Sequence, residues 1–331
     1  MKKPAGAQTA SVVEGVRRGD ARAIARAISA LEDHEPGAER IVQEIFPHTG
    51  KAFLVGLTGA PGTGKSSLAN RLAAHYRSAG KRVGILAVDP TSPFTGGALL
   101  GDRIRMQQHA TDDGIYIRSM ATRGVLGGLA RATGDAALVL DAAGKDVILI
   151  ETVGVGQDEV DIVRLADVTA LLLVAGLGDD VQSFKAGVME IADVFVINKA
   201  DRGDTDRLEQ ELKVVLGLSN RADQWQPPVV KTVATEGAGV PELAAALDDY
   251  RAHIERAGLR EEKRIQRWQE RLLDLIRERA LERVLKSGVS KEQLAGYARQ
   301  IARRERDPYG VVEELLGPLG SARGKAAGVK G

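Results

Sequence analysis

Short apolar runs alternate with stretches of helical spacing through the middle of the chain, from about residue 51 to residue 254. Unbroken runs of valine, isoleucine and leucine are typical of strands in a parallel sheet that helices cover on both faces. The pattern therefore predicts an α/β fold with a mostly parallel sheet flanked by helices. The predicted strands are residues 52–58, 83–88, 115–119, 147–150, 168–175, 194–197 and 229–233.

The two ends of the chain follow a helical pattern. Residues 11–46 carry apolar side chains at helical spacing, which predicts two short helices broken near Pro36 and Gly37. Long charged helices follow Gly258, and we expect the Gly-, Lys- and Ala-rich end to be disordered. The predicted division is a helical extension, an α/β domain, a helical arm and a disordered tail, at residues 1–50, 51–257, 258–318 and 319–331.

An apolar stripe lies on the first helix of the predicted arm, at Trp268, Leu272, Leu275 and Ile276. Such a stripe packs either on the core of the same chain or on a second copy, and its spacing is the same in both cases. The pattern alone leaves both arrangements open.

Residues 59–66 read Gly-Ala-Pro-Gly-Thr-Gly-Lys-Ser and fit the phosphate-binding pattern G-x-x-x-x-G-K-[ST], between a predicted strand and a predicted helix. Backbone N–H groups of such a loop surround phosphate oxygens, and the helix amino terminus adds partial positive charge. We expect Lys65 to reach the β- and γ-phosphates and Ser66 to bind Mg²⁺. The predicted nucleotide-binding residues of this P-loop are Gly59, Ala60, Pro61, Gly62, Thr63, Gly64, Lys65, Ser66 and Ser67.

The sequence Asn198-Lys199-Ala200-Asp201 directly follows a predicted strand and indicates which base is bound. The Asp201 carboxylate can accept hydrogen bonds from the ring N–H and the amino group of guanine, whereas adenine would leave it unpaired. We expect Asn198 to contact the base edge and the Lys199 stem to lie over the ring. The stretch that follows the next predicted strand is expected to provide a backbone N–H for the guanine oxygen, from Val233, Ala234 or Thr235. GTP is therefore the predicted nucleotide.

The hydrolytic residues are expected between these two motifs. Glu151 and Gly154 follow the strand at 147–150, where small GTPases have Asp-x-x-Gly. Glu151 would lie near Mg²⁺, and the Gly154 N–H would contact the γ-phosphate. Asp89 and Asp102 are further candidates for the Mg²⁺ site, because Mg²⁺ prefers oxygen ligands, although either could be a turn or capping residue.

The residue after Gly154 is Val155, where Ras-like enzymes have a glutamine that orients the attacking water. Valine cannot hold water, so we predict slow intrinsic hydrolysis that a partner or a rearranged loop accelerates. This profile favours a molecular switch over a metabolic kinase.

The composition of the chain excludes several classes of partner and of chemistry. The net charge is +1 with no basic stripe, so the sequence predicts no nucleic-acid or membrane partner. The chain has no cysteine, which excludes disulfides, thiolate catalysis and cysteine-based zinc sites. It shows neither a signal peptide nor an apolar run of about 20 residues, so we expect a cytoplasmic protein.

Three segments resemble one known family. Residues 151–157, Glu-Thr-Val-Gly-Val-Gly-Gln, are similar to the signature of metallochaperone-type P-loop GTPases. Residues 89–103 resemble the segment that distinguishes the MeaB branch, also known as ArgK. Asp307-Pro308-Tyr309 with Leu315-Leu316 resembles the carboxy-terminal helix of that branch. The resemblance runs from about residue 9 to residue 317.

The resemblance implies a homodimeric GTPase chaperone of adenosylcobalamin-dependent methylmalonyl-CoA mutase, which gates cofactor delivery from an adenosyltransferase and protects the mutase. It also implies the residue roles. The catalytic residues would be Lys65, Asp102, Glu151 and Gly154; the Mg²⁺ site would comprise Ser66, Asp89, Asp102 and Glu151; the switch residues would be Gly154, Gln157, Asp179, Gln182 and Lys185.

Other functions stay open at this point. Metal-insertion GTPases of hydrogenase or urease maturation share the nucleotide motifs but usually carry His- or Cys-rich metal sites, whereas the five histidines here are dispersed. An ATP-dependent transport-associated kinase conflicts with the guanine motif. A targeting GTPase of the signal-recognition type would need a methionine-rich domain, and the chain has only 4 methionines. The sequence does not identify which acyl-CoA mutase would be the client.

Overall fold

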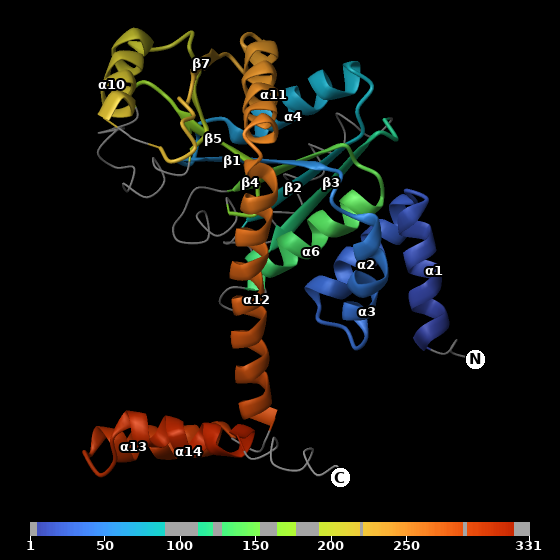
Figure 1. Ribbon diagram of the computed structural model, residues 1–331, viewed down its shortest axis with the longest axis vertical. Helices are drawn as coiled ribbons and strands as arrows, with labels where there is room; N and C mark the ends of the chain where they lie inside the picture. The colour runs from blue at the N-terminus through green and yellow to red at the C-terminus, as the bar shows by residue number, and fades with distance from the viewer. Residues whose placement is uncertain are drawn as a thin grey trace, which may run out of the picture. The chain divides into compact units, whose positions relative to one another are not determined.

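The computed structural model describes residues 5–89, 112–121, 128–152, 164–176, 192–218, 221–286 and 290–320 (Figure 1). The chain divides into two compact units, Met1–Arg260 and Glu261–Gly331. The first unit contains the sheet and the predicted nucleotide motifs, and the second contains carboxy-terminal helices. The tail that the sequence predicts to be disordered lies mostly outside the described residues.

Seven strands of the described residues form one sheet in the order β3-β2-β4-β1-β5-β6-β7. Every neighbouring pair is parallel, which confirms the predicted fold class. β4, β5 and β6 are buried along their whole length, which explains why their sequences are continuously apolar. The strands are β1 (Phe53–Gly59), β2 (Val83–Asp89), β3 (Ile115–Ala121), β4 (Val147–Thr152), β5 (Val168–Leu173), β6 (Val194–Asn198) and β7 (Val229–Thr232).

β1 lies at the point where the strand order reverses. Its neighbours are β4 on one side and β5 on the other, so the connections after β1 and after β4 lead to opposite halves of the sheet. In open parallel sheets such a switch point leaves a crevice at the carboxyl ends of the strands, where ligands bind. The loop that follows β1 is therefore placed where a ligand is expected.

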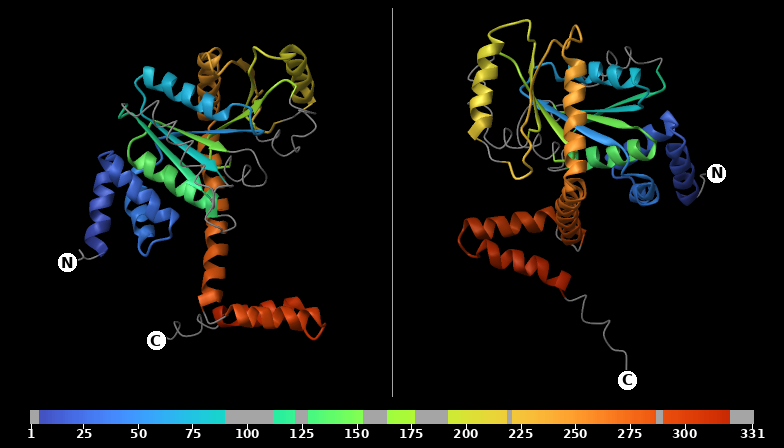
Figure 2. Two further views of the ribbon diagram at one scale, coloured as in Figure 1. Left: turned by 180° about the vertical axis from the view of Figure 1, so that it is seen from behind. Right: turned by 45° about the horizontal axis from the view of Figure 1, so that its top comes forward.

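Helices cover both faces of the sheet (Figure 2). α4 (Lys65–Ser78) and α11 (Val240–Arg256) pack on one face, in a core cluster with alternate residues of β1, β4, β5 and β6. α6 (Gly128–Ala142) packs on the other face with residues of β2 and β4. α10 (Thr205–Leu218) packs against Leu171, Leu173 and Phe195, which alternate with the residues of the first cluster and so point to the α6 face.

The amino-terminal region forms three helices, where the sequence predicts two. They are α1 (Ala5–Arg17), α2 (Ala21–Glu32) and α3 (Ala38–Ile45), and the 3-10 turn η1 (Phe46–His48) follows. Asp20 caps α2, because its side chain accepts a hydrogen bond from Ala23 N at 2.7 Å. The predicted break at Gly37 is present, and all three helices belong to the α6 core cluster.

The second unit comprises most of α12 (Leu259–Lys286), α13 (Lys291–Ala302) and α14 (Pro308–Gly320). Ser290 and Gln293 form a capping box at the start of α13. Glu314 of α14 accepts hydrogen bonds from Tyr297 Oη at 2.8 Å and from Arg306 at 2.5 Å, which ties α14 to α13 and the turn between them. None of the described helices has the length and apolar composition that crossing a membrane requires.

Candidate nucleotide-binding site

The predicted phosphate loop lies between the central strand β1 and the helix α4. Gly64 is the residue before α4 and has φ of 95°, in the left-handed region. A Cβ at this position would lie 2.4 Å from Asn198 Nδ2, so both backbone conformation and space require glycine. The strand–loop–helix arrangement expected from the motif is present.

Lys65 is the first residue of α4 and is buried. Its Nζ donates hydrogen bonds to Gly59 O at 2.5 Å and to Ala60 O at 3.0 Å, so the ammonium lies across the loop itself. Thr63 closes the same loop, because its Oγ1 donates to Ala60 O at 2.8 Å. The loop thus holds a positive charge at the amino end of a helix, which is an arrangement suited to phosphate.

Ser66 and Glu151 are brought together from distant parts of the chain. Glu151 lies near the end of β4, next to β1, with 4% of its surface exposed, and Ser66 Oγ donates a hydrogen bond to its Oε1. A hydroxyl and a carboxylate side by side are the hard oxygen donors that Mg²⁺ prefers. The two residues therefore fit the predicted Mg²⁺ site.

The other predicted metal residues are described only in part. Asp89 is the last residue of β2, two positions beyond Ala87, which pairs with Glu151. Its backbone therefore lies at the same edge of the sheet. Asp102 lies outside the described residues, and so do all the predicted switch residues, which are Gly154, Gln157, Asp179, Gln182 and Lys185.

Asn198 connects three segments of the site. It is the last residue of β6, and its side chain is 1% exposed. Its Nδ2 donates to Thr63 O in the phosphate loop at 2.7 Å, and its Oδ1 accepts from Thr232 Oγ1 at 3.0 Å and Ala234 N at 3.1 Å. Sequence reasoning expected a base contact, which stays a prediction, and missed this bridging role.

The structure reduces the number of backbone N–H groups that could contact the guanine oxygen. Val233 N donates to Ala238 O at 3.0 Å, and Ala234 N is held by Asn198. Of the three predicted N–H groups, that of Thr235 alone has no acceptor among the described residues. Thr235 N is therefore the remaining candidate.

Arg71 of α4 holds the same loop, and sequence reasoning did not single it out. Its Nε donates to Ala234 O at 3.0 Å, and its Nη2 donates to Thr235 O. A planar guanidinium can bond two successive carbonyls in this way. The helix that begins in the phosphate loop therefore also positions the loop that is expected to contact the base.

Asp201 lies at the surface, three residues beyond the end of β6. Lys199 has φ of 56°, and Ala200 N donates to Thr232 O at 3.0 Å, which ties this turn to β7. The Asp201 carboxylate forms an exposed ion pair with Arg202 at 3.3 Å and is accessible to a ligand. The phosphate loop and the Asn198–Asp201 turn thus lie at the same carboxyl edge of the sheet, joined by Asn198.

Relatives of known name match this chain over most of its length. A protein of Pyrococcus abyssi whose name describes a GTPase is 49% identical over 308 residues, covering 92% of this chain and 95% of that protein. The mouse protein named "Methylmalonic aciduria type A homolog, mitochondrial" is 32% identical over 321 residues, covering 91% of this chain and 77% of that protein.

A solved structure has a similar fold. It is described as a LAO/AO transport system kinase and matches with a TM-score of 0.71 and 26% identity, over 96% of this chain and 99% of that chain. The model of one protein family, described as "Methylmalonyl Co-A mutase-associated GTPase MeaB", matches residues 20–289. With the phosphate loop and the guanine motif at one edge of the sheet, this match shows that the chain belongs to the MeaB family and is a GTPase.

Proposed function

We propose that the protein is a molecular switch that gates the delivery of adenosylcobalamin to an acyl-CoA mutase and protects that mutase. Methylmalonyl-CoA mutase is the first candidate client, and a cobalamin adenosyltransferase is the candidate donor. The observation that carries the proposal is the family match over residues 20–289, whose description names a mutase-associated GTPase. The name of the mouse relative, which refers to methylmalonic aciduria, supports the same client.

The described geometry of Lys65, Ser66 and Glu151 supports the proposed hydrolytic roles. Lys65 would release the Gly59 and Ala60 carbonyls and bind the β- and γ-phosphates. Ser66 and Glu151 would hold Mg²⁺, with Asp89 and Asp102 as further candidates. Bound there, Mg²⁺ would supply positive charge for the phosphate oxygens. Asp201 and Thr235 N would select guanine.

Dimerisation through the second unit is part of the proposal. On α12 the side chains of Ile265, Leu272 and Ile276 are 52%, 54% and 62% exposed within the chain. They recur seven and four residues apart, so they lie along one side of the helix. A second copy of this chain would bury such a stripe, and sedimentation at several protein concentrations tests for it.

The first experiment measures GTP and ATP hydrolysis by the purified protein, alone and with an adenosylcobalamin-dependent acyl-CoA mutase. We expect slow, GTP-specific hydrolysis that the mutase accelerates. GTP-specific hydrolysis that is indifferent to every mutase tested would leave the GTPase in place and remove the proposed client.

Lys185→Ala tests the proposed switch segment. We expect it to leave GTP affinity largely intact and to weaken mutase-stimulated hydrolysis, because the proposed role of Lys185 is in a switch loop and not in the nucleotide site. Lys213→Ala is the matched control, since Lys213 forms an exposed pair with Glu209 on α10. Stimulation that is the same in both variants would contradict the role of Lys185.

A second candidate function is phosphate transfer in a transport system, because the similar solved structure is described as a kinase. That activity would consume ATP and leave phosphate on an acceptor. Thin-layer analysis of labelled ATP and GTP distinguishes the two functions, since a GTPase releases inorganic phosphate.

A further inference from the structure

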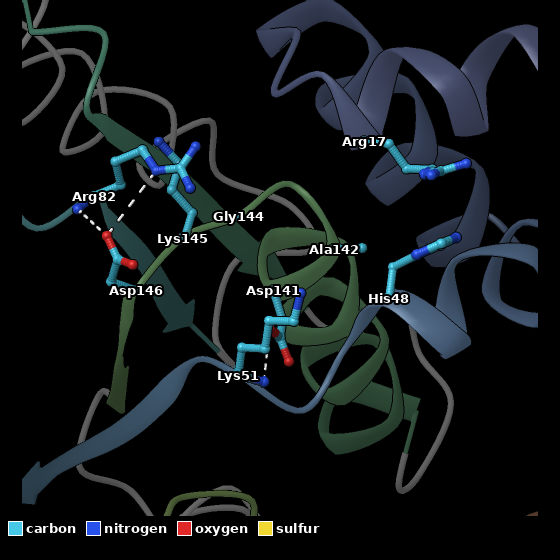
Figure 3. Close-up of a pocket in the computed structure, with 9 residues that line it drawn as sticks. All are labelled: Arg17, His48, Lys51, Arg82, Asp141, Ala142, Gly144, Lys145 and Asp146. Atoms are coloured by element: carbon cyan, nitrogen blue, oxygen red, sulfur yellow. Dashed lines mark hydrogen bonds and ion pairs between the residues drawn. The ribbon is translucent and has the colours of Figure 1, made fainter.

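A cavity of about 300 Å³ lies at the amino-terminal end of the sheet (Figure 3). Lys51 precedes β1, Arg82 precedes β2 and Lys145 precedes β4, so parallel strands bring these three cations to one edge. Arg17, the last residue of α1, also lines the cavity. The phosphate loop follows the opposite end of β1, so this cavity is separate from the nucleotide site.

The two carboxylates in the cavity wall are already bound to backbone N–H groups. Asp141 accepts hydrogen bonds from Gly50 N at 2.5 Å and Ala52 N at 3.0 Å, and so anchors the segment that enters β1. Asp146 accepts from Arg82 N at 2.7 Å. These acids therefore have structural roles and offset only part of the positive charge around the cavity.

The cations have few partners of their own. Within the described part of the chain, neither the Lys51 ammonium nor the Arg17 guanidinium lies within ion-pair distance of an acid. Arg82 is paired only loosely, with 4.0 Å between its Nε and Asp146 Oδ2. Its guanidinium extends over Gly144, where a Cβ would lie 2.6 Å from Nη2, and the φ of 77° at this glycine likewise disfavours a side chain.

Lys145 is buried, and its Nζ donates to Gly114 O at 3.0 Å, which leaves two of its N–H groups for other acceptors. Burial, then Arg82 and Arg77, lowers the pKa of Lys145 to about 8, against the opposing effect of Asp112 and Asp146. The other titratable groups around the cavity are His48, Arg17, Lys51 and Asp141. An anion would relieve this repulsion and favour the charged lysine.

We propose that the cavity binds a small polyanion that carries phosphate or carboxylate groups. Four cationic side chains line a space of about 300 Å³, which is the lower end of the range for small-molecule sites. Among the described residues that line it there is no leucine, isoleucine, valine, methionine, phenylalanine, tyrosine or tryptophan. The ligand is therefore recognised through its charges and has no large apolar body.

Calorimetry on protein carrying one equivalent of GDP tests the proposal, because GDP occupies the α- and β-phosphate positions of the P-loop. Binding that the double variant described below loses is assigned to the cavity, since those substitutions leave the vacant γ-phosphate position intact. Inorganic phosphate and succinate are titrated separately at low ionic strength, and the probe that binds more tightly distinguishes a phosphate ligand from a carboxylate ligand. We expect the double variant Lys51→Gln, Arg82→Gln to weaken binding at least about fivefold, since it removes two charged donors. Lys81→Gln is the matched control, because Lys81 is exposed, next to Arg82 in sequence and outside the cavity wall.

Proton uptake gives an independent readout. At pH 8 about half of the Lys145 side chains are charged, so anion binding should take up protons. This uptake is detected as a binding heat that depends on the ionisation enthalpy of the buffer.

Failure of both probes to bind the GDP-loaded protein would overturn the proposal, as would equal binding by the double variant and the Lys81→Gln control. If the double variant does not fold, the single variant Lys51→Gln is compared with the Lys81→Gln control instead, because the Lys51 side chain is exposed.

Discussion

The two ends of the parallel sheet present charge to a ligand in different ways. At the carboxyl end, Lys65 and Asn198 are held by loop carbonyls and neighbouring side chains, so the groups expected to bind nucleotide are arranged in one connected network. At the amino end, Lys51 and Arg82 project from the starts of separate strands and share no hydrogen bond. The first arrangement demands particular residues at fixed spacing, whereas the second needs only positive charge at several unrelated positions.

The largest expected effect is at the carboxyl end. Lys65→Met removes the ammonium that would bind the transferred phosphate, and we expect the rate of GTP hydrolysis to fall about 10²- to 10³-fold. Lys81→Met, which removes an exposed lysine beyond the end of α4, is the control. A rate within a few-fold of the wild type in both variants would show that the Lys65 charge does not act on the phosphates.

The Asn198 bridge gives the next effect. Asn198→Ala leaves Thr63 O, Thr232 Oγ1 and Ala234 N without their shared partner, and we expect a loss of about 3 kcal/mol in the free energy of unfolding. GTP affinity should fall about tenfold or more, because the phosphate loop and the base loop lose their connection. Urea unfolding and GTP titration measure the two losses.

Thr232→Val is the matched control for the Asn198 bridge. It removes one hydrogen bond at 3.0 Å and leaves the link from Asn198 to Thr63 intact. A loss of GTP affinity as large as that of Asn198→Ala would mean that the bridge acts through β7 alone.

The two ends also differ in how far the sequence predicts them. The phosphate loop is predictable, because G-x-x-x-x-G-K-[ST] specifies backbone geometry, and Gly64 shows why: no other residue fits beside Asn198. The proximity of Ser66 and Glu151 also follows. Glu151 lies near the carboxyl end of β4, and Ser66 lies in the first turn of the helix that follows the neighbouring strand β1. The strand pattern likewise predicts the parallel sheet.

The sequence does not predict hydrogen-bond partners that lie far apart along the chain. Asn198 and Thr63 are 135 positions apart, and no spacing rule pairs an amide with a particular carbonyl at that separation. In the sequence Arg71 looks like an ordinary surface arginine of a helix, and only the structure shows that it bonds Ala234 O. The helix break at Asp20 was missed because periodicity continues through it, and the cavity cations were missed because they belong to no motif.

The amino end should show its own effect on stability. The pKa of Lys145 is about 8 in the folded chain, below its ordinary value of 10.5. Between these two pKa values the unfolded chain binds more protons, so the free energy of unfolding rises with pH, by roughly 2 kcal/mol from pH 7.5 to pH 9.5.

Lys145→Met isolates the contribution of this group. It removes the titrating amine, so the rise attributed to Lys145 should disappear from urea unfolding measured across that pH range. The same slope in the variant would show that another group is responsible. Lys65→Met, at the carboxyl end, is the control for the pH dependence of the free energy of unfolding, because it removes a different buried lysine from the same chain.

The smallest expected effect tests whether the base loop depends on the helix that begins in the phosphate loop. Arg71→Ala removes the two donors that hold the Ala234 and Thr235 carbonyls, and we expect GTP affinity to fall about two- to fivefold. The free energy of unfolding should change little, because the side chain is exposed. Arg71→Lys should not restore affinity fully, since an ammonium cannot span both carbonyls as a planar guanidinium does. Arg207→Ala removes an exposed arginine that pairs with Glu211 on α10 and is the control. Equal GTP affinity in Arg71→Ala and the control would mean that Asn198 alone holds the base loop, and the carboxyl end would then depend on one bridge instead of two.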